Sequence, residues 1–398
     1  MLVRDDYLNK LIAYKDTEFI KVITGIRRSG KSTLLHLYKN YLEEKVNENS
    51  IFLLNFEHPD TFEIQTHDKL YAYLKNLVPQ NTKVYFLFDE IQEVDGWQKL
   101  VNSLRVAYDC DIYITGSNAT LLSGELATYL SGRYVEIKVY PFSFLEIVKF
   151  KKLENEKDIQ LAFNEYMKYG GFPSVVNLDN DLLKKDVLKG IYNSVILKDV
   201  SLRGSIQDVD LLLRIALFLM DNIGSPISIN NIVNYIKNQG FKASFERVDR
   251  YLGLLEDAFI FYKVQRYDIR GRERLKTLGK YYIVDPGLRN TMLQRDSANR
   301  GAQLENIVYL KLKSMGYDVF VGKYNNVEVD FVCFKNDMVK YVQVAYEIPQ
   351  NQDRQIRDLL SIKENYEKLI ITMNYLDVGV VDGIQVVHVI DFLLDESM

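Results

Sequence analysis

The chain has 398 residues, of which 47% are hydrophobic and 26% are charged. This composition is typical of a globular protein long enough for two or three domains, and it excludes a long disordered span. The formal net charge of -4 is too small to make the whole molecule a polyanion binder. Contact with nucleic acid would therefore need a local concentration of lysines and arginines.

The two cysteines and the N-terminal sequence indicate the cellular compartment of the protein. Cys110 and Cys333 lie in apolar surroundings without a second thiol or a histidine at ligand spacing, so we expect buried free thiols and no zinc site. The N-terminal residues lack an apolar signal core, and no apolar run reaches the roughly 20 residues that a membrane-spanning helix needs. We expect a cytoplasmic protein with no membrane segment.

Short apolar runs alternate with helical patterns over the first third of the chain. The apolar runs are FIKVIT, IFLLNF, VYFLFDE and DIYIT, and helices are expected at GKSTLLHLYKNYL and near residues 66–78 and 97–108. Strands that alternate with helices and are apolar almost throughout indicate a parallel sheet covered on both faces. The expected fold class is α/β, with this sheet in residues 1–140.

Three further parts are expected after the sheet. The strand signal fades after YVEIKVYPFSFLEIVKF, and residues 141–208 are predicted to form a helical lid subdomain in which GGFP is the clearest break. Three helical patterns and two extended pieces around the turn IRGRER predict a winged helix-turn-helix in residues 209–295. Residues 296–398 return to a mixture of helix and strand, which predicts a C-terminal α/β domain.

A phosphate-binding loop is predicted between the first strand and the first helix. Residues 25–32, GIRRSGKS, match the whole pattern G-x-x-x-x-G-K-[ST] in the strand-loop-helix context that a P-loop NTPase requires. Lys31 can reach the β and γ phosphates, and Ser32 can hold Mg²⁺. Arg27 and Arg28 could touch phosphate or a neighbouring subunit, or point into solvent. The predicted nucleotide contacts are Gly25, Ile26, Arg27, Arg28, Ser29, Gly30, Lys31, Ser32 and Thr33.

Two acids end the apolar run VYFLFDE. Asp89 suits a magnesium contact, and Glu90 suits the base that orients the attacking water, although Glu90 alone could also begin the next helix. The next strand ends near Thr115, Ser117 and Asn118, where a polar side chain could sense the γ-phosphate. A helix cap is the alternative role for Asn118.

The segments GIRRSGKS, YFLFDEIQ, YITGSNATLL, LSGRYVEIKVYPFSFLE and YGGFP occur in this order. On these segments the chain resembles prokaryotic ATPases of the AAA+ superfamily, in which a P-loop ATPase core precedes a restriction-endonuclease-like domain of unknown function. The resemblance implies ATP and Mg²⁺ as cofactors, with Lys31 and Ser32 as the nucleotide and magnesium contacts. It also implies that Asp89 and Glu90 form the second sequence motif of these ATPases, after the phosphate loop.

The resemblance extends to two further positions. It implies Asn118 or Ser117 as the sensor, and it places at Arg133, in LSGRY, an arginine that stabilises transition-state charge, in a neighbouring subunit of a homo-oligomer. A structural ion pair is the alternative for Arg133. The implied activity is ATP binding with slow hydrolysis coupled to a conformational change, and not a metabolic kinase reaction.

The predicted wing carries a local excess of positive charge. Residues 263–280 contain seven lysines and arginines against two acids. Such a concentration is typical of surfaces that bind a phosphate backbone, and double-stranded DNA is the leading partner. A solvated hairpin, or a wing that packs on the ATPase domain, is the alternative. The DNA-contact candidates are Arg247 and Arg250 on the third helix and Arg270, Arg272 and Arg274 in the wing.

The C-terminal part resembles a metal-dependent nuclease that has lost half of its motif. Such enzymes use an acid at the end of one strand and an acid-x-lysine pattern on the next. Glu305 and Asp330 are suitably placed, but Gln343 and Ala345 stand where the acid and lysine are expected. Because a neutral amide is a poor magnesium ligand, we predict a degenerate nuclease site at Glu305, Asp330 and Gln343. Residues that could have taken over the missing roles are Lys323, Glu328 and Glu347.

Three functional hypotheses follow from these motifs. The first is an ATP-driven switch or motor that acts on DNA. The second is a nucleotide-gated regulator that binds DNA or protein and turns over little ATP. The third, disfavoured by the altered motif, is an ATP-dependent nuclease.

Overall fold

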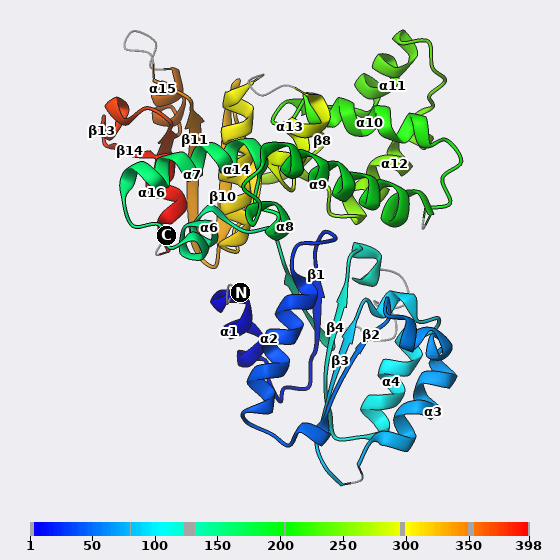
Figure 1. Cartoon of the computed structure of the whole chain (residues 1–398). Coiled ribbons are helices and arrows are strands. Elements are labelled where there is room, and N and C mark those ends of the chain that lie inside the picture. The colour runs from blue at the N-terminus through cyan, green and yellow to red at the C-terminus, as the bar shows by residue number, and fades with distance from the viewer. Residues whose placement is uncertain are drawn as a thin grey trace. The chain divides into compact units, whose positions relative to one another are not determined.

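The computed structural model describes residues 4–79, 81–122, 132–202, 204–294, 299–348 and 354–396 (Figure 1). The chain divides into two compact units, one comprising Met1–Pro141 with Asp257–Phe259, the other Phe142–Glu256 with Ile260–Met398. Both cysteines are free; Cys333 is buried and Cys110 is half-buried. Within the described ranges, no helix combines the length and apolar character needed to cross a membrane.

The first unit is built on a five-stranded sheet in the order β2-β3-β4-β1-β5. Every neighbouring pair in it is parallel, which confirms the predicted parallel sheet. The central strands β1 and β3 are buried along their whole length, as expected for apolar strands covered on both faces. The strands are β1 (Ile20–Thr24), β2 (Ile51–Asn55), β3 (Val84–Asp89), β4 (Cys110–Gly116) and β5 (Tyr134–Lys138).

Helices cover the two faces of this sheet (Figure 1). α1 (Asp5–Ala13) and α2 (Lys31–Glu43) pack on one face, and α3 (His67–Leu77) and α4 (Trp97–Ala107) on the other. Successive strand residues point to opposite faces. Leu87 of β3 accordingly lies in the core under α2, whereas its neighbour Phe86 lies in the core under α3 and α4. Short 3₁₀ turns are η1 (Glu48–Ser50), η2 (Pro59–Ile64), η3 (Ile91–Glu93) and η4 (Ala119–Leu122).

A buried ion pair joins β1 to β4 in this unit. Lys21 Nζ lies 2.5 Å from Asp111 Oδ1, and the side chains of both residues are fully buried. The other carboxylate oxygen of Asp111 accepts hydrogen bonds from the Tyr113 hydroxyl at 3.0 Å and from the backbone N–H of Asp16 at 2.8 Å. The ion pair and these hydrogen bonds offset the free-energy cost of removing the two charges from water.

The second unit contains a nine-stranded sheet in the order β13-β14-β12-β11-β10-β9-β7-β8-β6. Its strands are β6 (Pro226–Ile227), β7 (Phe261–Asp268), β8 (Glu273–Ile283), β9 (Asp318–Tyr324), β10 (Val327–Lys335), β11 (Met338–Ala345), β12 (Glu367–Thr372), β13 (Gly379–Val381) and β14 (Ile384–His388). The sheet is mixed, because β7 with β9, β11 with β12 and β12 with β14 run parallel and the other pairs antiparallel.

Helices precede and follow these strands in the second unit. Those before β7 are α6 (Phe144–Lys151), α7 (Glu156–Tyr169), α8 (Pro173–Val176), α9 (Asp181–Ser194), the π-helical η5 (Val195–Leu202), α10 (Val209–Asp221), α11 (Ile229–Asn238) and α12 (Phe245–Asp257). Those after β8 are α13 (Pro286–Leu293), α14 (Arg300–Ser314), α15 (Arg354–Leu360), η6 (Tyr375–Asp377) and α16 (Val389–Leu394).

The sheet of the second unit runs across the predicted boundary between residues 295 and 296. β7 pairs in parallel with β9, with Arg266 opposite Val321 and Asp268 opposite Lys323. The hairpin β7–β8 therefore has a neighbour on each side, β9 on one and β6 on the other. This pairing satisfies backbone groups that an isolated hairpin would leave open along its edge. The two predicted regions share one sheet.

The break at GGFP is fixed by a buried acid from a distant segment. Asp285 accepts backbone hydrogen bonds from Gly171 at 2.7 Å and from Gly287 at 2.9 Å. Gly170 has φ +73°, and a Cβ added to it would lie 2.0 Å from Asp285 Oδ1, so only glycine fits there. Burial raises the pKa of Asp285 to about 7, against the lowering effect of these hydrogen bonds.

Candidate functional site

The predicted phosphate loop connects β1 to α2 with two glycines in the left-handed half of φ space. Gly25 has φ +141°, and a Cβ added to it would lie 2.1 Å from the carbonyl oxygen of Val139. Gly30 has φ +100° and immediately precedes α2. Gly25 has no room for a side chain, and the positive φ of Gly30 favours glycine. The loop between them leads directly into the N-terminus of the helix.

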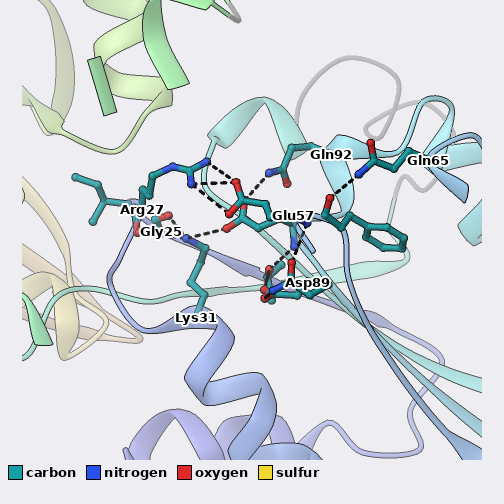
Figure 2. Close-up of polar contacts among 12 residues, drawn as sticks. Gly25, Arg27, Lys31, Glu57, Gln65, Asp89 and Gln92 are labelled. Carbon is teal, nitrogen blue, oxygen red and sulfur yellow. Dashed lines mark hydrogen bonds and ion pairs between the residues drawn. The ribbon is translucent and has the colours of Figure 1, made fainter. Parts of the chain in front are cut away.

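Lys31 connects this loop to the end of β3. Its Nζ donates to the carbonyl oxygens of Gly25 at 3.0 Å and Ile26 at 3.2 Å. The same atom lies 3.7 Å from Glu90 Oε1, and only 3% of the lysine side chain is exposed. Figure 2 shows the Lys31 side chain reaching toward Gly25 of the loop. A buried cation thus lies where the loop and the sheet edge meet.

Two arginines support the loop in different ways. Arg4, just before α1, is buried and donates from Nη1 to the carbonyl oxygen of Ser29 at 3.1 Å. Arg27 donates from both Nη atoms to Glu57 Oε1 at 3.0 Å, a forked ion pair that is drawn in Figure 2. Arg27 therefore does not simply point into solvent, whereas Arg28 is exposed. No sequence motif singled out Arg4.

Asp89 ends β3 among hydroxyl and amide groups. Thr115 Oγ1 of the adjacent strand β4 donates to Asp89 Oδ1 at 2.6 Å, and Asn55 Nδ2 of β2 donates to Oδ2 at 3.0 Å. Ser32 of the loop also hydrogen-bonds the carboxylate. Burial raises the pKa of Asp89, and the charge of Glu90 raises it further, while the Thr115 and Ser32 hydrogen bonds lower it. Ser32 and Asp89 thus lie together, and their role in a magnesium site stays a prediction.

Glu90 has a left-handed backbone, with φ 54° and ψ 48°, directly after β3. Its backbone N–H donates to Thr115 Oγ1 at 2.9 Å, so a single hydroxyl bridges Asp89 and Glu90. The amide of Gln92 donates to Glu90 Oε2. A left-handed conformation at a non-glycine residue is strained and is typical of functional sites.

The other predicted site residues lie in three places. Ser117 and Asn118 are buried just after β4. The side chain of Arg133 is exposed one residue before β5, and its carbonyl oxygen accepts from the backbone N–H of Ile20 at 2.9 Å. Thr33 is exposed in the first turn of α2. The roles of these residues stay predictions.

Comparison with known proteins places this geometry in a family. A model described as "AAA domain" matches residues 17–148, and a second, "Domain of unknown function (DUF8612)", matches residues 160–299. An uncharacterized protein of Haemophilus influenzae is 47% identical over 99% of each chain. Another, from Methanocaldococcus jannaschii, is 34% identical and covers 89% of this chain and 80% of its own length. The chain belongs to the AAA domain family of P-loop ATPases.

A solved structure agrees with this assignment at the level of fold. The Walker-type ATPase of Pyrococcus abyssi has a TM-score of 0.52 and 18% sequence identity, and the match covers 74% of this chain and 96% of that one. The AAA domain model and this shared fold together confirm the P-loop ATPase resemblance of the sequence.

Beyond the AAA domain, four charged side chains meet in the second unit. Lys280 of β8 has its Nζ 2.9 Å from Glu305 Oε1 of α14 and 3.0 Å from Glu328 Oε1 of β10. The same Nζ lies 3.7 Å from Asp330 Oδ1, also of β10. Only 3% of the Lys280 side chain is exposed. We call Lys280, Glu305, Glu328 and Asp330 the carboxylate cluster.

The structure brings all three predicted nuclease-site residues to this cluster. Gln343 Oε1 accepts from the backbone N–H of Asp330 at 3.3 Å, and Asp330 Oδ2 accepts from the backbone N–H of Val344 at 2.8 Å. Glu328, one of the proposed replacement residues, joins the cluster, whereas Glu347 is exposed. Sequence reasoning missed Lys280 because it counted this lysine among the cations of the wing.

All five predicted DNA-contacting arginines are exposed. Four of them also contact their own chain: Arg247 with the carboxylate of Asp208, Arg250 with the carbonyl oxygen of Gly204, Arg270 with the side chain of Asn325, and Arg274 over the ring of Phe320. Arg272 and Arg270 lie in or beside the turn between β7 and β8. The turn keeps an exposed positive charge even though Lys280 at the far end of β8 is buried.

Proposed function

We propose that this AAA-family chain binds ATP together with Mg²⁺ and hydrolyses the nucleotide. The observation that carries the proposal is the position of Lys31 Nζ, which lies between the loop carbonyls and Glu90. From there the ammonium can bind the β and γ phosphate oxygens. Ser32 and Asp89 offer the hydroxyl and carboxylate oxygens that magnesium prefers. Bound Mg²⁺ would supply positive charge to the phosphates during transfer.

Other residues of the chain have separate roles in the proposed hydrolysis. Glu90 orients the attacking water as a general base, and Thr115 fixes both acids by donating to Asp89 and accepting from the backbone of Glu90. Asn118 or Ser117 senses the γ-phosphate from the end of β4. Arg133 is exposed, which suits an arginine that completes the site of a neighbouring subunit in a homo-oligomer.

ATP turnover of three variants tests the proposal. Lys31→Ala should abolish nucleotide binding, whereas Glu90→Gln should keep binding and lower kcat by roughly a factor of 10² to 10⁴. Lys39→Ala is the matched control, because Lys39 lies on the same helix and pairs only with Glu43 on the surface among the contacts described. A wild type that hydrolyses no ATP, with or without DNA, would contradict the proposal. Tight binding with a rate indifferent to Glu90→Gln would favour the nucleotide-gated regulator.

A second proposal is that the chain acts on double-stranded DNA. The helices α10, α11 and α12 with the strands β6, β7 and β8 have the element order of a winged helix-turn-helix. We propose this motif for residues 209–295, between a helical lid in 141–208 and a nuclease-like α/β domain in 296–398. The supporting observation is the exposed positive charge of the turn, at Arg270 and Arg272.

Salt-dependent DNA binding tests this second proposal. The double change Arg270→Glu and Arg272→Glu should weaken binding to any duplex and reduce the slope of log K against log salt by about 2. Lys189→Glu on α9 removes another exposed cation and serves as the control. If the wing variant binds DNA like the control, the wing is not the contact surface.

A further inference from the structure

The carboxylate cluster has the composition of a metal site but holds a lysine at its centre. Glu328 and Asp330 are two residues apart on β10, so their side chains lie on the same side of the strand. Glu305 approaches from α14. An oxygen atom of each of these three acids lies within 3.7 Å of the same atom, Lys280 Nζ. Three carboxylates from two elements therefore converge on one cation.

The position of Lys280 decides whether a divalent ion fits. Magnesium and calcium bind carboxylate oxygens at about 2.0 to 2.6 Å. The ammonium group already stands at the point where the three oxygens converge, so a metal ion does not fit there beside it. Across the described residues, no group of three or more His, Cys, Asp or Glu side chains is arranged to hold a metal ion. The neutral amide of Gln343 adds no further negative charge.

We propose that Lys280 is the built-in cation of the carboxylate cluster, in the place that a divalent metal ion would take in a nuclease-like site. The second unit then folds and keeps this site closed without metal. The inference does not rest on the ATPase proposal, because none of its residues belongs to the AAA domain.

The surroundings of Lys280 support a permanent ammonium ion. Burial lowers the pKa of Lys280, but the charges of Glu305, Asp330 and Glu328 raise it more, and the net shift is upward. Two of the acids have a further donor. The Tyr282 hydroxyl donates to Glu305 Oε1, the oxygen that also faces Lys280, and the backbone N–H of Val344 donates to Asp330 Oδ2. Burial and the charge of Glu305 raise the pKa of Asp330 to about 7, so Lys280 is the cation shared by an acidic cluster.

Manganese binding to nucleotide-free protein tests the proposal directly. The Ser32→Ala, Asp89→Asn protein is the background, because these changes remove both proposed metal contacts of the AAA domain. Its Mn²⁺ binding is measured by electron paramagnetic resonance. We expect no saturable binding up to millimolar Mn²⁺ and no change in melting temperature. Saturable binding that disappears when Asp330→Asn is added would overturn the proposal.

Removal of the lysine charge gives a second test of the proposal. Lys280→Met replaces the lysine by an uncharged side chain of similar length and leaves three carboxylates facing one another. The melting temperature should therefore fall by about 10 °C in metal-free buffer. Added Mn²⁺ should raise it again, and Asp330→Asn in the same protein should prevent this recovery. A Lys280→Met protein as stable as its background would overturn the proposal. If this variant does not fold, the Mn²⁺-binding measurement on the protein with Lys280 in place still tests whether the cluster takes a metal ion.

Discussion

The two carboxylate oxygens of Glu90 have different partners, and Gln92 holds one of them. The amide of Gln92 donates to Glu90 Oε2, while Glu90 Oε1 lies 3.7 Å from the ammonium of Lys31. Gln92 Oε1 is itself buried and has no hydrogen-bond partner among the described residues. Gly116 leaves room for it, since an added Cβ would lie 2.7 Å from this oxygen. Gln92 thus restrains the rotation of the proposed base.

Gln92→Ala should lower kcat for ATP hydrolysis by about tenfold while the Kd for ATP stays within about twofold, because the change frees the carboxylate without touching the phosphate loop. Gln92→Glu should lower kcat further, because it places a second negative charge beside Glu90. Single-turnover kinetics together with equilibrium nucleotide binding separate the two quantities. An unchanged kcat in Gln92→Ala would show that Lys31 alone positions the base.

Thr115→Val should raise the Mg²⁺ concentration needed for half-maximal ATP turnover by about tenfold, the effect of one lost buried hydrogen bond. The hydroxyl donates to Asp89 and accepts from the backbone of Glu90, and valine has the same shape without either function. Thr115→Ser keeps the hydroxyl and is the control. The same magnesium dependence in the valine and serine variants would refute the prediction.

Lys21→Met should reduce the free energy of unfolding of the first unit by about 3 to 5 kcal/mol, because it leaves the buried carboxylate of Asp111 without its cation. Lys39→Met, at an exposed pair on α2, should cost less than about 1 kcal/mol. Urea denaturation followed by the single tryptophan, Trp97, reports on this unit. Adding Asp111→Asn to Lys21→Met should recover part of the loss, and no recovery would contradict the ion-pair explanation.

Asp285→Asn should change the dependence of stability on pH. Because burial raises the pKa of Asp285 from 3.8 to about 7, the folded chain binds a proton there more readily than the unfolded chain. The contribution of this group to stability is thus largest below pH 4 and declines as the pH rises toward 7. The difference in melting temperature between wild type and Asp285→Asn should shrink from pH 5 to pH 8. A constant difference would mean that the backbone hydrogen bonds from Gly171, Gly287 and Leu288 keep Asp285 ionised throughout.

The parts of the nucleotide site that could be predicted are those whose residues are adjacent in sequence. The loop around Lys31 and the acids Asp89 and Glu90 follow from local patterns, because a strand, a tight turn and a helix are each specified by neighbouring residues. Thr115 was named from the sequence but its partners were not, because they depend on β4 lying beside β3, which is a tertiary relationship. Gln92 was not singled out, although its partner Glu90 is only two residues away.

The carboxylate cluster shows why the remaining features were not predictable. Lys280 lies 25 residues from Glu305 and 50 from Asp330, and they meet only in the folded unit, where α14 packs against both β8 and β10. A charge count along the chain treats every lysine as exposed. The one local signal was that Lys280 directly precedes the apolar run YYIV, where a charged side chain needs a buried partner.

The parallel pairing of β7 with β9 limits how this chain can vary in evolution. A recombination event between residues 295 and 298 would join a β7 from one ancestor to a β9 from another, and the new neighbours would have to match in register and side-chain shape. The stretch from β7 to the end of the sheet is consequently inherited as a block. Sequence exchange among family members should have its breakpoints before this sheet, near residue 141, and not at the predicted boundary between residues 295 and 296.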